Sequence, residues 1–242
     1  MNSIVQGILN KSKLEIDHIK ITNATKNSFL MSLKGKATKI GVATATISAM
    51  TVDLVGPSGA FGRLQVPDIK MGSLGADISI VNQEISIIDM NAFTSFVRAV
   101  MQDDNLLLRL ENGQTTVKSM GMKSSIVYKK EVHLKGLKLL QATLLKAEQD
   151  GNDVESSFSL ANPSQFEIDL GTVIYEVQNG DGRRIGEQKG STHVKRGNSS
   201  LTLTGAVSGA ISQGKTKFVG VGVEEDNWLK EVIKSIYVVI NI

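Results

Sequence analysis

The feature that most constrains the fold is a two-residue alternation of apolar and polar side chains. In residues 166–170, Phe166, Ile168 and Leu170 alternate with Glu167 and Asp169. Such alternation turns one set of side chains towards a core and the other towards water, as antiparallel sheets require. The same pattern recurs in three further segments, 106–110, 173–177 and 201–204. The sequence therefore predicts an all-β chain.

Turn signals separate these segments at short intervals and favour hairpins. The glycine-rich segment from Gly180 to Gly186 (GDGRRIG) superficially resembles a phosphate-binding loop. A dinucleotide fingerprint, however, requires a helix directly after it, and residues 187–191 are too short and glycine-broken for one. We interpret the segment as a hairpin turn, with Gly182 and Gly186 in conformations that favour glycine. The predicted turns are 56–59, 111–113, 150–152, 179–182 and 196–198.

Two segments have helical spacing instead. Between Asp89 and Met101 the apolar residues recur every three or four positions, and Asp89 suits the helix N-cap. Between Glu224 and Tyr237 a second apolar stripe includes Trp228, and acidic residues at its start complement the helix dipole. We expect short helices near 89–101 and near 225–236.

The two halves of the chain resemble each other in the spacing of their glycines and apolar residues. Gly59 and Gly182 are 123 positions apart, as are Ile78 and Leu201. Asn23 and Asn162, each at a turn, form a further pair. We interpret these spacings as an internal duplication. It predicts two tandem β-sandwiches, residues 1–140 and 141–242, with their boundary in the polar stretch Leu144–Asp153.

Composition excludes several classes of protein and site. Hydrophobic residues make up 41% of the chain, which is enough for a real core, and the absence of cysteine excludes disulfides and thiol chemistry. The net charge of +3 is dispersed and aromatic residues are only 5%, so we expect no nucleic-acid partner. No apolar run approaches the ~20 residues of a membrane span, and residues 1–20 lack a signal-peptide pattern. We expect a cytoplasmic location if the chain is complete, and an endomembrane or vacuolar one if an N-terminal anchor has been removed.

No set of residues predicts an active site. His18, His133 and His193 are separated by sixty positions or more and lack metal-ligand spacing, although a triad built from distant loops stays open. Adjacent acids such as Asp103-Asp104 do not face each other across a cleft, as glycosidase acids do, and residues 179–182 hold only a fragment of a calcium loop. We therefore expect a protein that is not an enzyme and has no catalytic, cofactor-binding or metal-binding residues. Its ligand-binding residues stay unknown.

Several motifs resemble an uncharacterised fungal domain family. That family is similar to the group-two late embryogenesis abundant proteins, also called the water-stress-and-hypersensitive-response (WHy) domain. The resemblance covers about Leu14 to Ile242 and implies tandem immunoglobulin-like β-sandwiches without catalytic residues. Alanine stands at position 24, where an Asn-Pro pair is usual. The motifs are 21–25, 28–29, 45–47, 52–54, 61–64, 67–69 and 88–97 in the first half, and 159–164, 173–177, 181–182 and 185–186 in the second.

These observations favour a non-enzymatic binding or structural module of the LEA-like type, with a stress-related role. Its expected partner is a lipid or a membrane surface, bound in a groove beneath one of the helices and steered there by basic rim residues. The apolar stripe of Phe93, Phe96, Val97 and Val100 is equally compatible with simple packing of a helix on a filled core. The alternatives are a self-associating homo-oligomer or protein-binding module, and an enzyme with an interdomain pocket.

Overall fold

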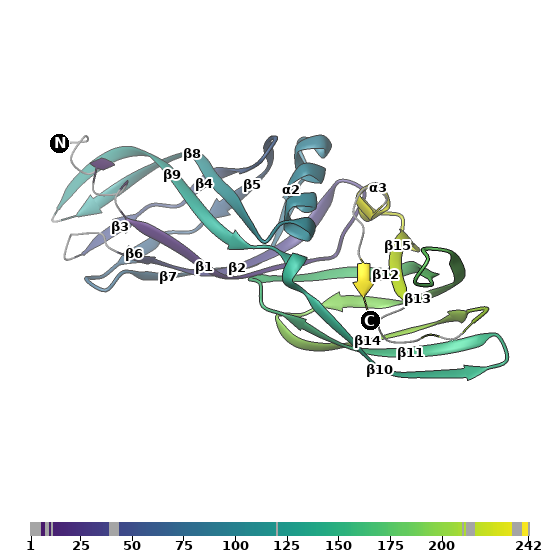
Figure 1. Ribbon diagram of the computed structural model, residues 1–242. Helices are drawn as coiled ribbons and strands as arrows, with labels where there is room; N and C mark the ends of the chain where they lie inside the picture. The colour runs from purple at the N-terminus through teal and green to yellow at the C-terminus, as the bar shows by residue number, and fades with distance from the viewer. Residues whose placement is uncertain are drawn as a thin grey trace. The chain divides into compact units, whose positions relative to one another are not determined.

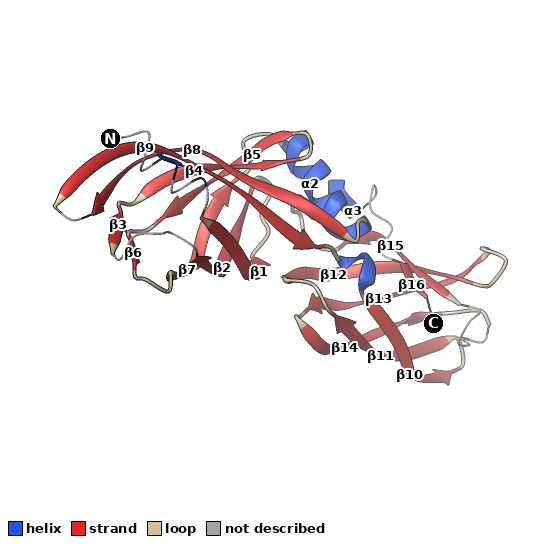
Figure 2. Ribbon diagram, turned by 60° about the vertical axis from the view of Figure 1, so that its left-hand side comes forward, coloured by secondary structure: helices blue, strands red, loops and turns tan. Residues whose placement is uncertain are grey.

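The computed structural model describes residues 6–7, 10, 12–38, 44–119, 121–209, 211, 216–233 and 239–241 (Figure 1). The fold is all-β, as predicted, and Figure 2 shows strands with only short helices. The chain divides into two compact units, which we describe separately. The first comprises Met1–Lys20, Ser28–Ala99 and Asn105–Leu134, and the second Ile21–Asn27, Val100–Asp104 and Lys135–Ile242. The pair of immunoglobulin-like domains with bounds 1–140 and 141–242 stays a prediction.

The first unit is built from two sheets. One contains β1, β2 and β7 as neighbours, and the other has the order β5-β4-β8-β3-β6, with β9 also paired to β8. Both sheets bury every second residue, most regularly in β9, where the residues from Ser124 to Lys135 alternate between buried and exposed. The strands are β1 (Lys13–Thr22), β2 (Ser28–Thr38), β3 (Ala45–Ile47), β4 (Met50–Gly56), β5 (Gly59–Val66), β6 (Ile69–Met71), β7 (Ala76–Ser86), β8 (Asn105–Ser119) and β9 (Met122–Lys135).

The predicted first helix is confirmed as α2 (Met90–Gln102). Asp89 caps it, because its Oδ1 accepts a hydrogen bond of 2.9 Å from the backbone N–H of Ala92. Phe93 is fully buried and stacks on Phe29 with the ring centroids 5.2 Å apart. Phe96 stacks on Phe61 at 4.6 Å. Phe93 and Phe96 of the apolar stripe therefore pack on the first unit.

In the second unit, the strands follow the order β10-β11-β14-β13-β12, and β15 pairs with both β12 and β16. The polar stretch Leu144–Asp153 lies in the β10–β11 hairpin, with Gly151 at φ 63° in its turn. The elements are a 3-10 helix (Leu137–Leu139), β10 (Gln141–Asp150), β11 (Asp153–Asn162), β12 (Phe166–Gln178), β13 (Arg184–Val194), β14 (Gly197–Ala206), β15 (Lys217–Val223), α3 (Leu229–Ile233) and β16 (Val239–Asn241).

The Asn-Pro turn between β11 and β12 is organised by one buried side chain. Asn162 Oδ1 accepts hydrogen bonds from the backbone N–H and the hydroxyl of Ser164, at 2.9 and 2.7 Å. Its Nδ2 donates to the carbonyl oxygens of Phe166 and Lys195. An asparagine that bonds two residues ahead ends one strand and orients the next, as its sequence context predicts.

The second predicted helix begins later than expected. Within the described residues α3 starts at Leu229 rather than near 225, and positions 234–236 lie outside them. Glu225 is not in a first helical turn. Both oxygens of its carboxylate accept from the backbone N–H of Thr172, at 2.9 and 3.0 Å, beside an irregularity in β12. Partial burial acts to raise the pKa of Glu225, but these hydrogen bonds outweigh it and hold the pKa below its usual value.

Two turn predictions also need correction. Residues 111–113 do not form a turn, because β8 runs through them with Asn112 in the left-handed region at φ 61°. Gly113 is needed there for space, since a Cβ would lie 2.9 Å from Val52 Cγ1. Gly186 is likewise a close-approach glycine rather than a turn residue, because a Cβ would lie 2.3 Å from the carbonyl oxygen of Ala206. The other predicted hairpin turns are confirmed.

The proposed duplication does not extend to strand pairing. Gly59 and Gly182 both have positive φ in the turn of a two-stranded hairpin, as expected. However, β7 pairs with β2, the strand after the Asn23 turn, whereas β14 pairs with β11, the strand before the Asn162 turn. The two halves therefore do not correspond strand for strand.

Candidate functional site

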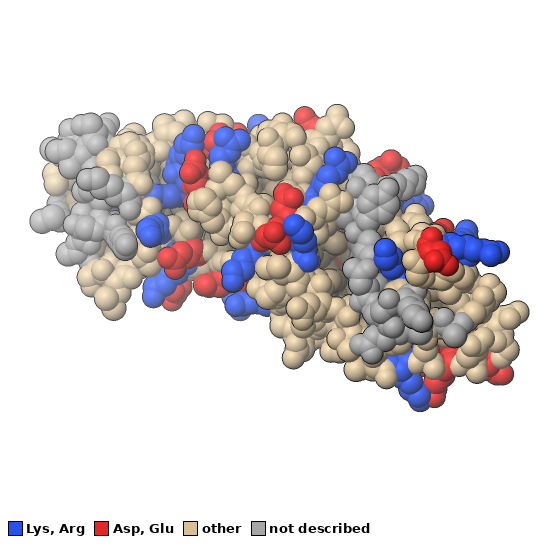
Figure 3. Space-filling view, viewed as in Figure 1, with Lys and Arg blue, Asp and Glu red and all other residues tan. Residues whose placement is uncertain are grey.

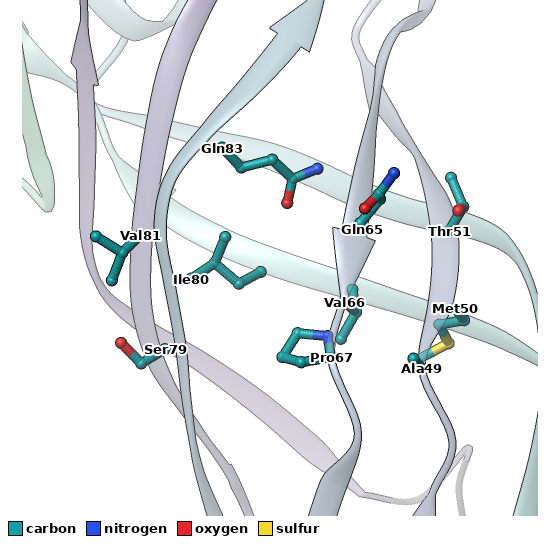
Figure 4. A pocket seen from close by; sticks show the side chains of 10 residues that line it. All are labelled: Ala49, Met50, Thr51, Gln65, Val66, Pro67, Ser79, Ile80, Val81 and Gln83. Atoms are coloured by element: carbon teal, nitrogen blue, oxygen red, sulfur yellow. The ribbon is translucent and has the colours of Figure 1, made fainter.

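The strongest candidate site is a cleft in the first unit between β5 and β7. These are edge strands of the two sheets, and Figure 4 shows Ile80 and Gln83 of β7 pointing towards β5. The cleft has a volume of about 650 Å³, within the usual range for ligand sites. Its lining consists of Ala49, Met50, Thr51, Gln65, Val66, Pro67, Ser79, Ile80, Val81 and Gln83.

A β-bulge in β7 shapes one side of the cleft. In the pairing with β2, Met31 lies opposite Gln83 and Leu33 opposite Ile80, so one residue of β2 faces two of β7. The hydroxyl of Ser32 holds the extra residues: it accepts from the N–H of Asn82 at 2.8 Å. Bulges redirect side chains. Here Val81 is left 70% exposed at the cleft.

The two edge strands are joined at one end of the cleft. The backbone N–H of Ile88 donates to the carbonyl oxygen of Phe61 at 3.0 Å. Gly62 permits this approach, because a Cβ at that position would lie 2.7 Å from Ile85 Cγ2. The strands can therefore part only beyond this point, towards Val66 and Pro67.

Gln83 makes the last link before the strands separate. With its amide oriented to satisfy both groups, Nε2 donates to the carbonyl oxygen of Gln65 at 2.9 Å and Oε1 accepts from the Gln65 N–H at 2.7 Å. This two-bond pattern is the one that a neighbouring strand makes in a ladder. A side-chain amide thus occupies the position of a peptide group on the edge of β5.

The lining combines an apolar floor with a neutral polar rim. Met50, Val66 and Ile80 are buried core residues whose side chains reach the cleft. Thr51 and Ser79 are exposed on the rim. None of the ten lining residues is charged or a histidine, so the cleft offers apolar contact and hydroxyl or amide hydrogen bonds but no acid–base pair.

A second hollow, of about 500 Å³, lies in the second unit where β10, β11, β13 and β14 meet. Its surroundings are charged, with Glu148, Asp150, Asp153, Glu155 and Lys189 among its lining residues. Most of these side chains lie on the outer face of the sheet. The hollow differs from the β5–β7 cleft in the charge of its lining residues.

The residues considered for catalysis are dispersed. His18 lies on β1 and His133 is exposed on β9, as its alternation predicts. His193 Nε2 lies 2.9 Å from Glu167 Oε1, in a pair that joins β13 to β12. In the segment considered as a phosphate loop, the N–H of Gly182 closes a hairpin turn on the Asn179 carbonyl at 2.9 Å, which confirms the turn interpretation. Across the described ranges, no three His, Asp or Glu side chains cluster as metal ligands.

None of the cleft residues is predicted from the sequence to bind a ligand. Met50, Val66 and Ile80 read as ordinary core positions, since a floor and a filled core require the same residues. The sequence contains one signal of the cleft. Ile78 and Ile80 follow the two-residue period, but the next isoleucine, Ile85, is an odd number of positions after Ile80 and so breaks that period. Such a break indicates a bulge.

The surface and the helices add two observations. On the face shown in Figure 3, Lys and Arg side chains are interspersed with Asp and Glu, without a stripe of one sign. Neither α2, at 13 residues, nor any other helix in the part of the chain covered by the structure has the length and apolarity to cross a membrane.

Comparison with known proteins gives a family match over just under half of the chain and no activity. Residues 59–177 match a family described as protein of unknown function (DUF3712), and no match to the LEA or WHy family accompanies it. No curated protein matches the sequence. Two similar structures are the crystal structure of CBD12 from CALX1.2 and that of red sea bream transglutaminase. For the first, identity is 11%, the TM-score is 0.24, and 89% of this chain and 83% of that one are covered. For the second, the values are 11%, 0.23, 84% and 28%.

Proposed function

We propose that the protein is a non-enzymatic binding module that holds one fatty acyl chain of a lipid in the β5–β7 cleft. The observation that carries this proposal is the cleft's chemistry: core side chains of Met50, Val66 and Ile80 line an open cleft that contains no charge. The LEA-like, WHy-type assignment belongs to the same proposal and is supported by the motif residues 162–164 and 173–177.

The expected affinity follows from the apolar area that an acyl chain would bury. Each methylene is worth about 0.8 kcal/mol, so burial of about fifteen gives roughly 12 kcal/mol before the cost of association. That cost is at least about 4 kcal/mol, which leaves at most about 8 kcal/mol and a dissociation constant no tighter than about micromolar.

The cleft favours an acyl chain over an extended peptide. A peptide that adds a strand needs a run of free backbone N–H and C=O groups along the edge. On β5 the Gln65 groups are already bonded to Gln83, and Pro67, just beyond the strand, has no N–H. An acyl chain needs neither group, because it binds through apolar contact alone.

A basic residue lies beside the rim. Lys34 is exposed on β2 and is the register partner of the lining residue Ser79. The neighbouring pair, Lys36 and Asp77, combines opposite charges and so leaves Lys34 as the cation nearest in register to the cleft. We expect an anionic headgroup at this side, with the weakening by salt that an exposed charge contact shows.

Titration with a fluorescent fatty acid tests the proposal. Ser79→Trp places a large ring on the exposed rim, and blocking two methylenes costs about 1.6 kcal/mol, so we expect affinity to fall at least about tenfold. Ser125→Trp, on the exposed face of β9, is the matched control and should bind like the wild type. No saturable binding to the wild type, or equal loss in both variants, would exclude the cleft as a lipid site.

A parallel titration with vesicles tests whether the charge of the lipid headgroup contributes to binding. Anionic and zwitterionic vesicles are compared at low and physiological salt, with the wild type and Lys34→Gln. The proposal predicts preference for anionic vesicles, reduced by salt and by Lys34→Gln. Equal binding to both vesicle types would contradict the proposed contact between Lys34 and an anionic headgroup.

A further inference from the structure

The strand β9 presents a long free edge on the first unit. Among the residues that the structure describes, β9 pairs only with β8, and it extends over fourteen residues. Val127 and Met122 are 45% and 49% exposed on it. A long, regular edge strand with apolar residues is a template for pairing with another chain.

One side-chain amide covers this edge at its centre. Gln6 Nε2 donates to the carbonyl oxygen of Val127 at 3.0 Å, and Gln6 Oε1 accepts from the Val127 N–H at 3.1 Å. A third hydrogen bond, from Gln6 Nε2 to Asn10 Oδ1 at 2.9 Å, holds the amide in place. Gln83 makes the same two-bond contact with Gln65. A glutamine amide therefore pairs with the backbone of two edge strands of one sheet, β5 and β9.

The positions around Val127 are self-complementary. Both backbone groups of Val127 point away from β8, because Gln6 binds both. If two β9 strands pair antiparallel about a two-fold axis at Val127, then Lys123 of each copy lies opposite Glu131 of the other. Both side chains are exposed on the same face as Val127. Opposite charges directly across an antiparallel pair stabilise it, and a two-fold interface requires this kind of self-complementarity.

A further feature of β9 restrains such pairing. Lys130 points inward, is only 7% exposed, and donates from Nζ to the backbone carbonyl oxygen of Ser12 at 2.7 Å. Inward-pointing charged residues are one of the means by which natural edge strands avoid pairing. The edge of β9 therefore has features that favour pairing with a second copy and features that oppose it.

We propose that β9 is a latent homodimer edge centred on Val127 and that Gln6 is the cap that closes it to a second copy of this chain. When the amide leaves Val127, the freed N–H donates to the carbonyl oxygen of Val127 in the second copy, and the freed carbonyl oxygen accepts from the N–H of that residue. Lys123 and Glu131 then set the register of the pair.

Sedimentation velocity across a range of protein concentrations tests this proposal. Gln6→Ala should lower the dimer dissociation constant at least about tenfold relative to the wild type. Gln114→Ala, at an exposed position of β8, is the matched control and should leave it unchanged. In the Gln6→Ala background, Lys123→Glu should return the protein to monomer. Adding Glu131→Lys should restore the dimer.

Hydrogen exchange at the Val127 amide gives the second readout. It should be at least about tenfold faster in a monomeric Gln6→Ala sample at low concentration than in the wild type. Unchanged exchange would show that Gln6 is no cap. Faster exchange without dimerisation, or a dimer insensitive to the charge swap, would overturn the interface.

Discussion

At the scale of single residues, Phe96 is one of the aromatic side chains that pack α2 against the strands of the first unit. It is buried and stacks on Phe61, and its Cβ lies 3.0 Å from where a Cβ on Gly56 would stand. Phe96→Ala should lower the free energy of unfolding by about 3–5 kcal/mol, measured by urea denaturation. Leu74→Ala, at a side chain that is 86% exposed, should change it by less than about 0.5 kcal/mol. A loss below about 1 kcal/mol for Phe96→Ala would mean that the helix packs loosely and would return the groove beneath α2 to consideration.

The buried side chain of Tyr175 makes the stability of the fold depend on pH in the alkaline range. Burial raises its pKa to about 12, while its hydrogen bond with Thr192 acts in the opposite direction. The unfolded chain loses this proton near pH 10 and the folded chain does not. The folded state therefore binds more protons between pH 10 and 12, and stability falls as the pH rises through that window.

Tyr175→Phe should reduce this alkaline loss of stability. The measurement is the free energy of unfolding at pH 9, 10 and 11 for both proteins. The variant is expected to lose the hydroxyl contact at every pH but to show a shallower decline above pH 10. Part of the decline should persist, since burial also raises the pKa of Tyr128. A decline of equal slope in both proteins would show that Tyr175 titrates normally.

At the scale of elements, the β11–β12 turn depends on Asn162. Its removal leaves buried polar groups of Ser164 and Phe166 without their partner. Asn162→Ala should therefore cost about 1–3 kcal/mol of stability, measured by denaturant unfolding. Asn198→Ala, at an exposed position on β14, is the control and should be close to neutral. Equal effects of the two substitutions would mean that the turn forms without this network.

The elements that the sequence predicted best are those with a local physical cause. Alternation located the strands, and helical spacing with a capping aspartate located α2 to within a residue. The errors came from tertiary contacts: Asn112 and Gly113 read as a turn but continue β8, and Glu225 read as a helix-start acid but binds a strand amide. The residues that these segments contact are distant in the sequence, and a local pattern does not predict them.

The candidate site was less predictable than the fold. The sequence predicts either a groove beneath one of the helices or a helix packed on a filled core, and the apolar face of α2 packs on Phe29 and Phe61. The cleft depends on two edge strands that are joined near Phe61 and parted near Val66, and this divergence is a property of pairing rather than of any one segment. Only the odd spacing between Ile80 and Ile85 pointed towards it.

At the scale of the whole molecule, the family match and the structural units do not coincide. The match begins at Gly59 in β5 and ends at Val177 in β12, so it includes residues assigned to each unit. The β5–β7 cleft draws its lining from both sides of the start of that match: Ala49, Met50 and Thr51 precede it. A test of function therefore requires the whole chain rather than the matched segment.

The most direct test of the proposed function is photo-crosslinking with a fatty acid that carries a photoreactive group in its acyl chain. After digestion and mass spectrometry, the account predicts that labels concentrate on peptides containing Met50, Val66 and Ile80–Val81. Labelling should saturate at micromolar ligand and fall at least about tenfold in Ser79→Trp. Labels concentrated on Phe93 and Phe96, or spread over exposed side chains such as Leu74 and Leu145, would contradict the account.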